Sequence, residues 1–348
     1  MSRKHVFIAA GLAVFAIAAA CLYYFDFRRS EVAGASSPEL LSEIPAGSSS
    51  LLYIDLEALR ASGFYQHRPN HAPITVPDSN YADFIRQTGF DFEKDLDRAV
   101  IASLPQSGPE SGPQSGSSGR RKTMILAEGR FDRQKIHDYA MRTGKLDKQD
   151  GRDVFLFPTE NPKGWNSLVF LDDHRVAIAE GSSIAPVLAL RPADSAAGPA
   201  SDPARQRIAR IAGAAVIAVS RVPDIPDNFA PGGMQSAQLV NMLRSVQWIT
   251  LAALPQGDNL RVSLEGECKT DTDARQLKST IDVMRLIGQA ALDTPKNRKQ
   301  MDPATLSVIL TLLKTADVTA SGERVRILME LTPDILSLSN NQNKQAAQ

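Results

Sequence analysis

The sequence predicts an α+β fold, with an N-terminal transmembrane helix followed by two similar halves that have mainly antiparallel sheets. Three observations carry this prediction. An uncharged run of twenty residues, 6–25, precedes the rest of the chain. Short segments typical of strands then alternate with amphipathic helical segments. A stretch rich in Pro, Ala, Ser and Asp, residues 192–208, separates the two halves and reads as a linker.

The composition sets limits on the class of protein. The chain has 348 residues, 43% of them apolar, which excludes wholesale disorder and a membrane protein with many spans. Its 39 basic and 39 acidic residues give no net charge. A balanced charge removes the usual electrostatic argument for nucleic acid as a partner.

Residues 6–25, VFIAAGLAVFAIAAACLYYF, are long enough to cross a bilayer. Twenty helical residues span about 30 Å, the thickness of the hydrocarbon core. Aromatic residues end the run, where their rings favour the headgroup level, and Asp26 then stops it. We therefore expect a single-pass anchor in the lipid bilayer, with residues 1–5 in the cytoplasm and the body outside it.

Three other interpretations of this run stay open. Ala18-Ala19-Ala20 could serve as a signal-peptide cleavage site, and together with Cys21 the alanines resemble a bacterial lipoprotein box. A buried core helix is the third. The aromatic end favours the uncleaved anchor over all three.

The first half of the body is expected at residues 47–191, after a tether at 26–46. Its strands and helices follow from local pattern and turn residues. In chain order we expect strand 50–56, helix 57–59, helix 81–87, strand 99–104 paired with strand 123–128, a helix capped by Asp132, strand 154–157, a hairpin of 167–171 with 175–179, and helix 182–190.

The second half is expected at residues 209–335, before a disordered tail at 336–348. Asp271 begins a long helix, and Asp302-Pro303 is a cap followed by a first helical turn. The expected elements are strand 214–220, helix 235–246, a hairpin of 248–254 with 260–265, helices starting at 271 and 303, and strand 325–331.

Both halves follow the order β-α-β-β-α-β, which is that of a ferredoxin-like unit. A short sequence similarity between the halves supports an internal repeat. Glu128-Gly129 precedes one helix and Glu265-Gly266 precedes the corresponding one. We therefore expect two related ferredoxin-like halves.

One short motif resembles known proteins. Ile44-Pro45-Ala46-Gly47, followed by the strand 51–56, resembles the opening of a group of uncharacterised bacterial proteins that have a membrane anchor and an extracytoplasmic α+β body. The resemblance implies a protein of the cell envelope, and it carries no functional residue over to this chain.

The local motifs of the common enzyme classes are absent from the sequence. Glycine spacing excludes a dinucleotide-binding loop and a P-loop, and there is no GxSxG, SxxK or HExxH. The only cysteines are Cys21 and Cys268, so no multi-cysteine metal site and no disulfide within the body is expected.

Several polar residues have spacings that suggest a site, but the sequence favours ordinary surface groups. His67 and His71 have helical metal-site spacing, but Pro69 lies between them. An EF-hand beginning at Asp91 fails at its sixth and twelfth positions. The same interpretation covers the remaining acids and histidines, Glu93, Asp95, Asp97, Asp224, Asp227, His137 and His174.

Glu128 and Glu265 were the two carboxylates that the repeat could pair as a glycosidase would. We expect them instead to be solvated, each at its own strand end. No catalytic, cofactor-binding or metal-ligating residue is therefore assigned.

These observations favour a membrane-tethered extracytoplasmic protein that binds or scaffolds, with a protein of the cell envelope as its partner. An envelope enzyme with a site in the groove between the halves is the alternative. A structural subunit of a larger membrane complex is the third.

Overall fold

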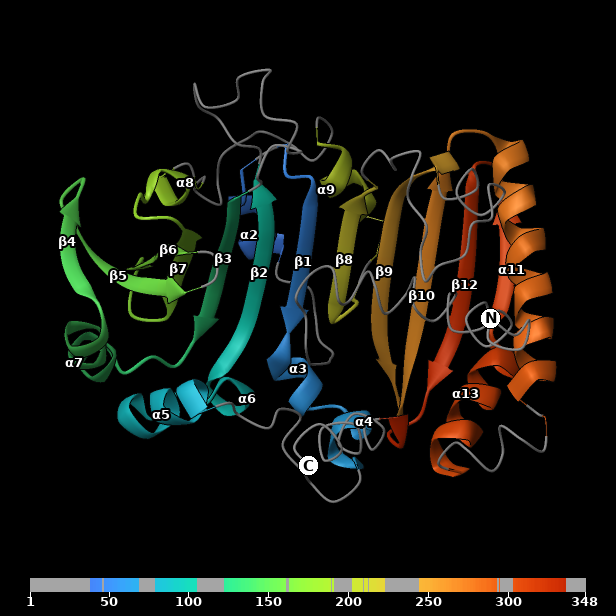
Figure 1. Ribbon diagram of the computed structural model, residues 1–348, viewed down its shortest axis with the longest axis horizontal. Coiled ribbons are helices and arrows are strands. Elements are labelled where there is room, and N and C mark those ends of the chain that lie inside the picture. The colour runs from blue at the N-terminus through green and yellow to red at the C-terminus, as the bar shows by residue number, and fades with distance from the viewer. Residues whose placement is uncertain are drawn as a thin grey trace. The chain divides into compact units, whose positions relative to one another are not determined.

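The computed structural model describes residues 38–45, 47–68, 79–104, 122–160, 163–188, 190, 202–208, 210–211, 213–222, 244–292, 294 and 303–335 (Figure 1). Helices and antiparallel strands make up these ranges, which confirms the mixed α and β class. The expected anchor at 6–25 lies outside them. Among the described helices, none combines the length and the apolar character needed to cross a bilayer.

The chain divides into two compact units, and the first comprises residues 31–61 and 75–220. Its sheet has the strand order β8-β1-β2-β3-β7-β6-β5-β4. These strands are β1 (Ser50–Asp55), β2 (Leu96–Leu104), β3 (Lys122–Gly129), β4 (Lys145–Gln149), β5 (Arg152–Glu160), β6 (Lys163–Phe170), β7 (Arg175–Glu180) and β8 (Val216–Arg221).

Short helices accompany this sheet. Four of them have clear physical starts, because Asp55, Asp91 and Asp132 cap α3, α6 and α7 by accepting backbone N–H groups, and Pro203 opens α9. The helices are α2 (Pro38–Glu43), α3 (Leu56–Arg60), α5 (Ser79–Thr88), α6 (Phe92–Asp95), α7 (Arg133–Thr143), α8 (Ala185–Leu188) and α9 (Pro203–Ile208).

One row of residues across the first sheet is fully buried. Tyr53, Val100, Leu126 and Ala177 lie opposite one another across β1, β2, β3 and β7, and each is 0% exposed. Residues that face one another across antiparallel strands share one side of the sheet. This row therefore forms the centre of the first core.

The described residues of the second unit fall within 62–74 and 221–348. Its strands follow the order β11-β12-β10-β9. Its elements are α4 (Gly63–Gln66), β9 (Val246–Gln256), β10 (Asn259–Cys268), α11 (Asp271–Leu292), α13 (Pro303–Thr315), β11 (Asp317–Ser321) and β12 (Arg324–Leu331).

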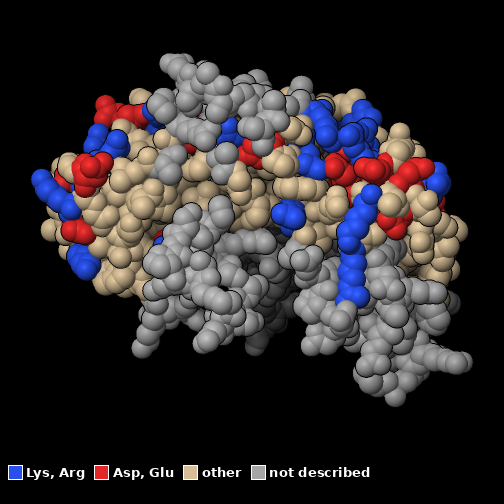
Figure 2. Space-filling view, turned by 90° about the horizontal axis from the view of Figure 1, so that it is seen from above, with Lys and Arg blue, Asp and Glu red and all other residues tan. Residues whose placement is uncertain are grey.

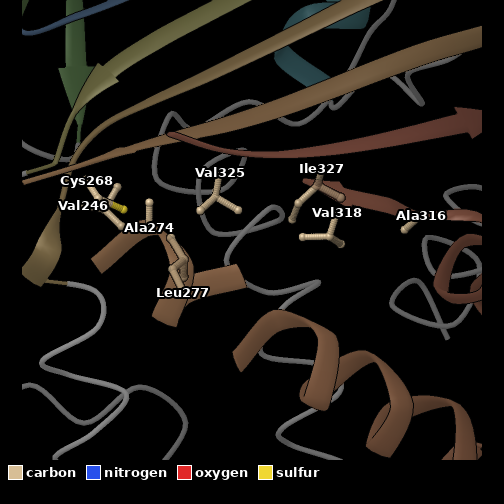
Figure 3. Packing of buried hydrophobic residues seen from close by; sticks show 8 residues of the cluster. All are labelled: Val246, Cys268, Ala274, Leu277, Ala316, Val318, Val325 and Ile327. Atoms are coloured by element: carbon tan, nitrogen blue, oxygen red, sulfur yellow. The ribbon is translucent and has the colours of Figure 1, made fainter. Parts of the chain in front are cut away.

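The core of the second unit lies between α11 and one face of its sheet. Figure 3 shows Ala274 and Leu277 of α11 beside Val246 and Cys268 at one end of this cluster. Residues of α13's end and of β11 and β12 complete it, namely Ala316, Val318, Val325 and Ile327. Helix α11 packs on β10, β12 and β11, and α13 packs beside α11 and on β12.

The ferredoxin-like order is not found in the described strand pairings. That order would place the first strand between the third and the fourth. In the first unit β1 pairs with β2 and β8, and in the second unit β10 pairs with both β9 and β12. Sequence pattern shows which face of a strand is buried but not which strand lies beside it, and this is why the order was wrong.

Most of the expected elements are found, with different limits. The pairing of 99–104 with 123–128 is confirmed in β2 and β3, and 248–254 pairs with 260–265 in β9 and β10. Strand 214–220 corresponds to β8, which pairs with β1 of the first unit. Strands β4 and β11 were not expected. Most of the expected helix 235–246 lies outside the described residues, and its last residue, Val246, begins β9.

Candidate functional site: a row of charges across the first sheet

A row of alternating charges crosses four strands of the first unit. Asp55 of β1 lies opposite Arg98 of β2, Arg98 opposite Glu128 of β3, and Glu128 opposite Arg175 of β7. Directly opposed residues share a face, so the four side chains lie side by side as acid, base, acid and base. We call these four residues the charge row.

Arg98 is the centre of the row. Its Nε donates to Asp55 Oδ2 at 3.3 Å and its Nη1 donates to Glu128 Oε1 at 3.2 Å. Its Nη2 donates to Glu57 Oε2, at the start of α3, at 2.8 Å. One guanidinium group thus joins β1, β2, β3 and α3.

Asp55 is the most buried member, with 1% of its surface exposed. Its Oδ1 accepts the backbone N–H of Ala58 at 3.0 Å and so caps α3. The Tyr53 hydroxyl donates to Oδ2 at 3.2 Å. A carboxylate this deeply buried needs an opposite charge beside it, and Arg98 supplies that charge.

Arg175 closes the other end of the row. Its Nη1 donates to Glu43 Oε1, at the end of α2, at 2.5 Å, and its Nε donates to Asp172 Oδ2 at 2.6 Å. Burial raises the pKa of Glu43, and the opposing effect of Arg175 does not cancel this. The pair therefore holds α2 against the sheet through a partly desolvated ion pair.

The charge row lies at the boundary of the dry core. Two residues further along each strand, on the same face, stand the fully buried Tyr53, Val100, Leu126 and Ala177. Arg98 and Glu128 themselves keep 26% and 32% of their side-chain surfaces exposed. Water therefore reaches the row from one side only.

The chemistry of this arrangement is that of an ion network. Five carboxylates, those of Asp55, Glu57, Glu128, Glu43 and Asp172, surround two guanidinium groups, a formal charge of 2 − 5 = −3. The donors and acceptors satisfy one another, whereas nucleophilic catalysis needs a nucleophile beside a base. On the face shown in Figure 2, acidic and basic side chains likewise lie in mixed groups.

The second unit contains a shorter counterpart of the charge row, which consists of one glutamate and one arginine. Hairpin β9-β10 leads into α11 and the later strand β12 returns beside β10, as β2-β3 leads into α7 and β7 returns beside β3. Glu265 lies opposite Arg326, whose Nη2 donates to Glu265 Oε2 at 2.9 Å. On the other side Glu265 faces Thr250, so no buried acid extends this row.

The two carboxylates that the sequence singled out therefore have separate partners. Glu128 is bound by Arg98, and Glu265 by Arg326 and more distantly by Arg324. They are only partly solvated, since Glu265 keeps 16% of its side chain exposed. The expectation that each is solvated at its own strand end is therefore not met: Glu128 is the last residue but one of β3, whereas three residues of β10 follow Glu265.

The histidines occupy ordinary positions. His67 Nδ1 lies 3.1 Å from Asp258 Oδ1, and both side chains are more than half exposed. His71 lies outside the described residues. His137 contacts Asp138 and stands edge-on to the Phe155 ring.

The acidic residues at 91–97 have structural roles. Asp91 caps α6, and Asp97 pairs with Arg60 and Arg130. Within the described ranges no three His, Cys, Asp or Glu side chains are grouped as a metal site requires. Asp224, Asp227 and Cys21 lie outside these ranges, while Cys268 is buried, and its burial raises the pKa of its thiol.

Replacing Arg98 with Ala should strongly destabilise the protein. The substitution leaves the buried Asp55 carboxylate without its counter-charge, and removing one partner of a buried pair costs about 3 kcal/mol. Arg326→Ala is the matched control, because Arg326 is 57% exposed and such pairs contribute about 1 kcal/mol or less. Urea unfolding measures both, and equal losses would contradict the importance of the charge row.

The pH dependence of stability should report on Glu43. A raised folded pKa gives a contribution that is complete below the unfolded pKa and is lost as the pH rises through the folded pKa. Glu43→Gln should therefore gain stability relative to the wild type between about pH 4 and about pH 7. Urea unfolding at both pH values measures the difference.

Asp172→Asn is the control with the opposite sign. Burial raises the pKa of Asp172, but hydrogen bonds from the His174 amide and Arg175 outweigh it, so the pKa is lowered. Its contribution is complete above the unfolded pKa and is lost as the pH falls. Between about pH 4 and about pH 7 this variant should therefore differ from the wild type by a nearly constant amount, and the difference should shrink only below about pH 4. A gain over that range like the one expected for Glu43→Gln would show that Glu43 is not responsible.

Comparisons with known proteins assign no family. No protein-family model matches the chain, and no curated protein matches it. Among solved structures, it is similar to crystal form III of the Treponema protein TP0453 at 11% identity, covering 86% of this chain and 97% of that one, with a TM-score of 0.46. Crystal form IV is 11% identical, covers 87% of this chain and 99% of that one, and has a TM-score of 0.45. Crystal form I is 10% identical, covers 86% of this chain and 96% of that one, and has a TM-score of 0.40. These values support no statement about function.

Proposed function

We propose that the protein is a membrane-tethered scaffold that works by binding another protein chain, with α11 supplying the contact surface. The apolar outer face of α11 is the observation that carries the proposal. The tether is supported by the apolar run at 6–25 and by its aromatic end.

The second half of α11 exposes a stripe of large apolar side chains. Val283, Leu286 and Ile287 are 51%, 61% and 37% exposed. Their spacing of three and four residues places them on one face of the helix, and Ala290, also exposed, extends it. We call these four residues the α11 stripe. Contiguous exposed apolar surface of this kind is typical of protein contact sites.

The first half of the same helix is polar on the outside. Arg275, Gln276 and Ser279 are exposed there, while Ala274 and Leu277 are buried against the sheet. The change from polar to apolar along one helix shows that exposed apolar residues are confined to one part of α11. A purely solvated helix would carry polar residues along its whole outer face.

Helix α11 is well held in place near the stripe. The Arg285 guanidinium donates to the Ala316 carbonyl, and Gln289 Nε2 donates to the Leu313 carbonyl at 2.6 Å. Lys278 and Asp282 form an ion pair along the helix at 2.6 Å. A partner would therefore meet an ordered surface, which lowers the entropic cost of association.

A photo-crosslinking amino acid at Val283 should join the chain to one partner in intact membranes. The same amino acid at Gln276, two helical turns away on the exposed side, should give at least about fivefold less adduct, because polar surface is weakly represented in contact cores. Gel mobility and mass spectrometry measure the adduct. Leu286→Glu should abolish it without changing the melting temperature, and equal adducts at both positions would contradict the proposal.

The tether makes a separate prediction. The full chain should stay in the membrane fraction after washing with alkaline carbonate, because a helix of about twenty apolar residues is not released by loss of charge contacts. A reporter enzyme fused after Gln348 should be active in the form that works only outside the cytoplasm. Activity of a cytoplasm-only reporter at the same position would reverse the orientation.

A further inference from the structure

We infer that the partner of the α11 stripe is a second copy of this chain, joined by antiparallel pairing of the two β11 strands. The inference rests on the proposed function and names its partner. Its evidence is the open edge at β11, the self-complementary sequence of that strand, and the position of α11 above it.

Strand β11 ends the order of strands in the second unit. It pairs with β12, from Asp317 opposite Leu328 to Ser321 opposite Arg324. In the part of the chain that the structure describes, no strand pairs with the other edge of β11. An edge of this kind presents backbone N–H and C=O groups that can pair with another strand.

Apart from the shortness of the strand, the sequence of β11 does nothing to protect this edge. Its five residues, DVTAS, include no Lys, no Pro and a single charge at the first position. Val318 faces the core, and Asp317, Thr319 and Ser321 are exposed. Natural edge strands usually carry lysines, prolines or bulges that prevent pairing.

Strand β4, which ends the sheet order of the first unit, provides the contrast. Its sequence is KLDKQ, with two lysines in five residues, and four of the five side chains are exposed. Antiparallel pairing of two β4 strands about their central residue would place Asp147 against Asp147 of the second copy. Like charges directly opposite one another destabilise a pair of strands.

Antiparallel pairing of two β11 strands, in contrast, brings no like charges together. Pairing about its central residue places Thr319 against Thr319, Val318 against Ala320, and Asp317 against Ser321. No like charges meet, and Thr–Thr pairs are among the favourable cross-strand pairs. The strand is therefore complementary to a second copy of itself, as a two-fold interface requires.

The α11 stripe lies on the side of the helix that such a dimer would cover. Arg285 and Gln289 reach the end of α13. Ile287 is two residues from each, so it points about 200° away from them around the helix. In Figure 1, α11 lies at the outer end of this unit, with α13 toward β12, and Ile287 therefore lies on the side away from α13.

Simple geometry allows the strands and helices to meet together. Adjacent strands are about 4.8 Å apart, so a two-fold axis between two β11 strands lies about 2.4 Å beyond each. Helix α11 packs over β11, β12 and β10, with its most extensive contact on β11. Where its axis passes between β11 and β12, it lies about 4.8 Å from the two-fold axis and about 10 Å from the helix of the second copy, the upper end of the distance range of packed helices. Val283 and Ile287 of the two copies would fill this contact.

A cysteine at Thr319 tests the pairing in the full-length chain with Cys21 replaced by Ser, in membranes and in mild detergent. The central pair brings the two Cα atoms to about 4.5–5.5 Å, within the range of a disulfide. Oxidation should give a covalent dimer. Asp147→Cys in β4, also an exposed edge residue, should give at least about tenfold less, because this variant keeps the two lysines that protect the β4 edge. Adding Ile287→Glu should reduce the Thr319 dimer at least about fivefold, with an unchanged melting temperature.

The outcomes separate the two proposals. A Val283 adduct with a different protein and no Thr319 dimer overturns this inference and leaves the proposed function standing. Absence of both overturns both. Equal dimers from Thr319→Cys and Asp147→Cys would show random collision, and a Thr319 dimer unaffected by Ile287→Glu would remove α11 from the interface; either result contradicts the inference.

Discussion

The architecture of the first unit depends on the buried carboxylate of Asp55 and its pairing with Arg98. A slip of one residue in the pairing of β1 with β2 would turn Arg98 to the other face of the sheet. Asp55, 1% exposed, would then lose its counter-charge, and a buried carboxylate without an opposite charge beside it is costly. The register that satisfies Asp55 is also the one that aligns Tyr53 with Val100 in the dry core. Electrostatics and hydrophobic packing thus select the same alignment.

The two units share one hairpin–helix–strand connection, but they differ in how deeply the charged residues beside it are buried. In each, a hairpin leads into a helix, a later strand returns beside the hairpin, and a glutamate near the end of the second hairpin strand faces an arginine. Only in the first unit does the row continue to a buried aspartate that also caps a helix. The second unit relies instead on aliphatic packing between its helices and its sheet. Within the described residues, the charge row thus joins a buried aspartate to the core of the first unit, whereas the pair of Glu265 and Arg326 reaches no such aspartate.

Local signals explain what the sequence could predict. The hairpin of β2 and β3 was expected because each strand contains a short, nearly continuous apolar run, and α11 was expected because an acidic start precedes a helical apolar period. Strand β4 was missed because KLDKQ has a single apolar residue, and β11 because DVTAS alternates over only two apolar residues, which is too short a pattern to predict a strand. The ferredoxin-like order was wrong because strand neighbours are set by tertiary packing, which no local pattern records.

The charge row was only partly visible in the sequence. Glu128 was noticed through the repeat, but Asp55, Arg98 and Arg175 were not, since the four residues come from four strands far apart in the chain. One signal could have found them. Each is a charged residue two positions from a small or apolar residue of an apolar strand, which is where a core meets solvent. That signal identifies where the core meets solvent along one strand, whereas the oppositely charged residue on the neighbouring strand is known only from the fold.

The burial of Cys268 gives the second unit a built-in reporter. Its thiol lies among Val246, Ala274 and Leu277, 1% exposed, with a pKa raised by that burial. A thiol reagent needs both access and the thiolate, and the closed structure limits both. With Cys21 replaced, the rate of labelling would therefore measure how often α11 separates from its sheet. The labelling rate of this buried thiol thus reports directly on the opening of the core around it.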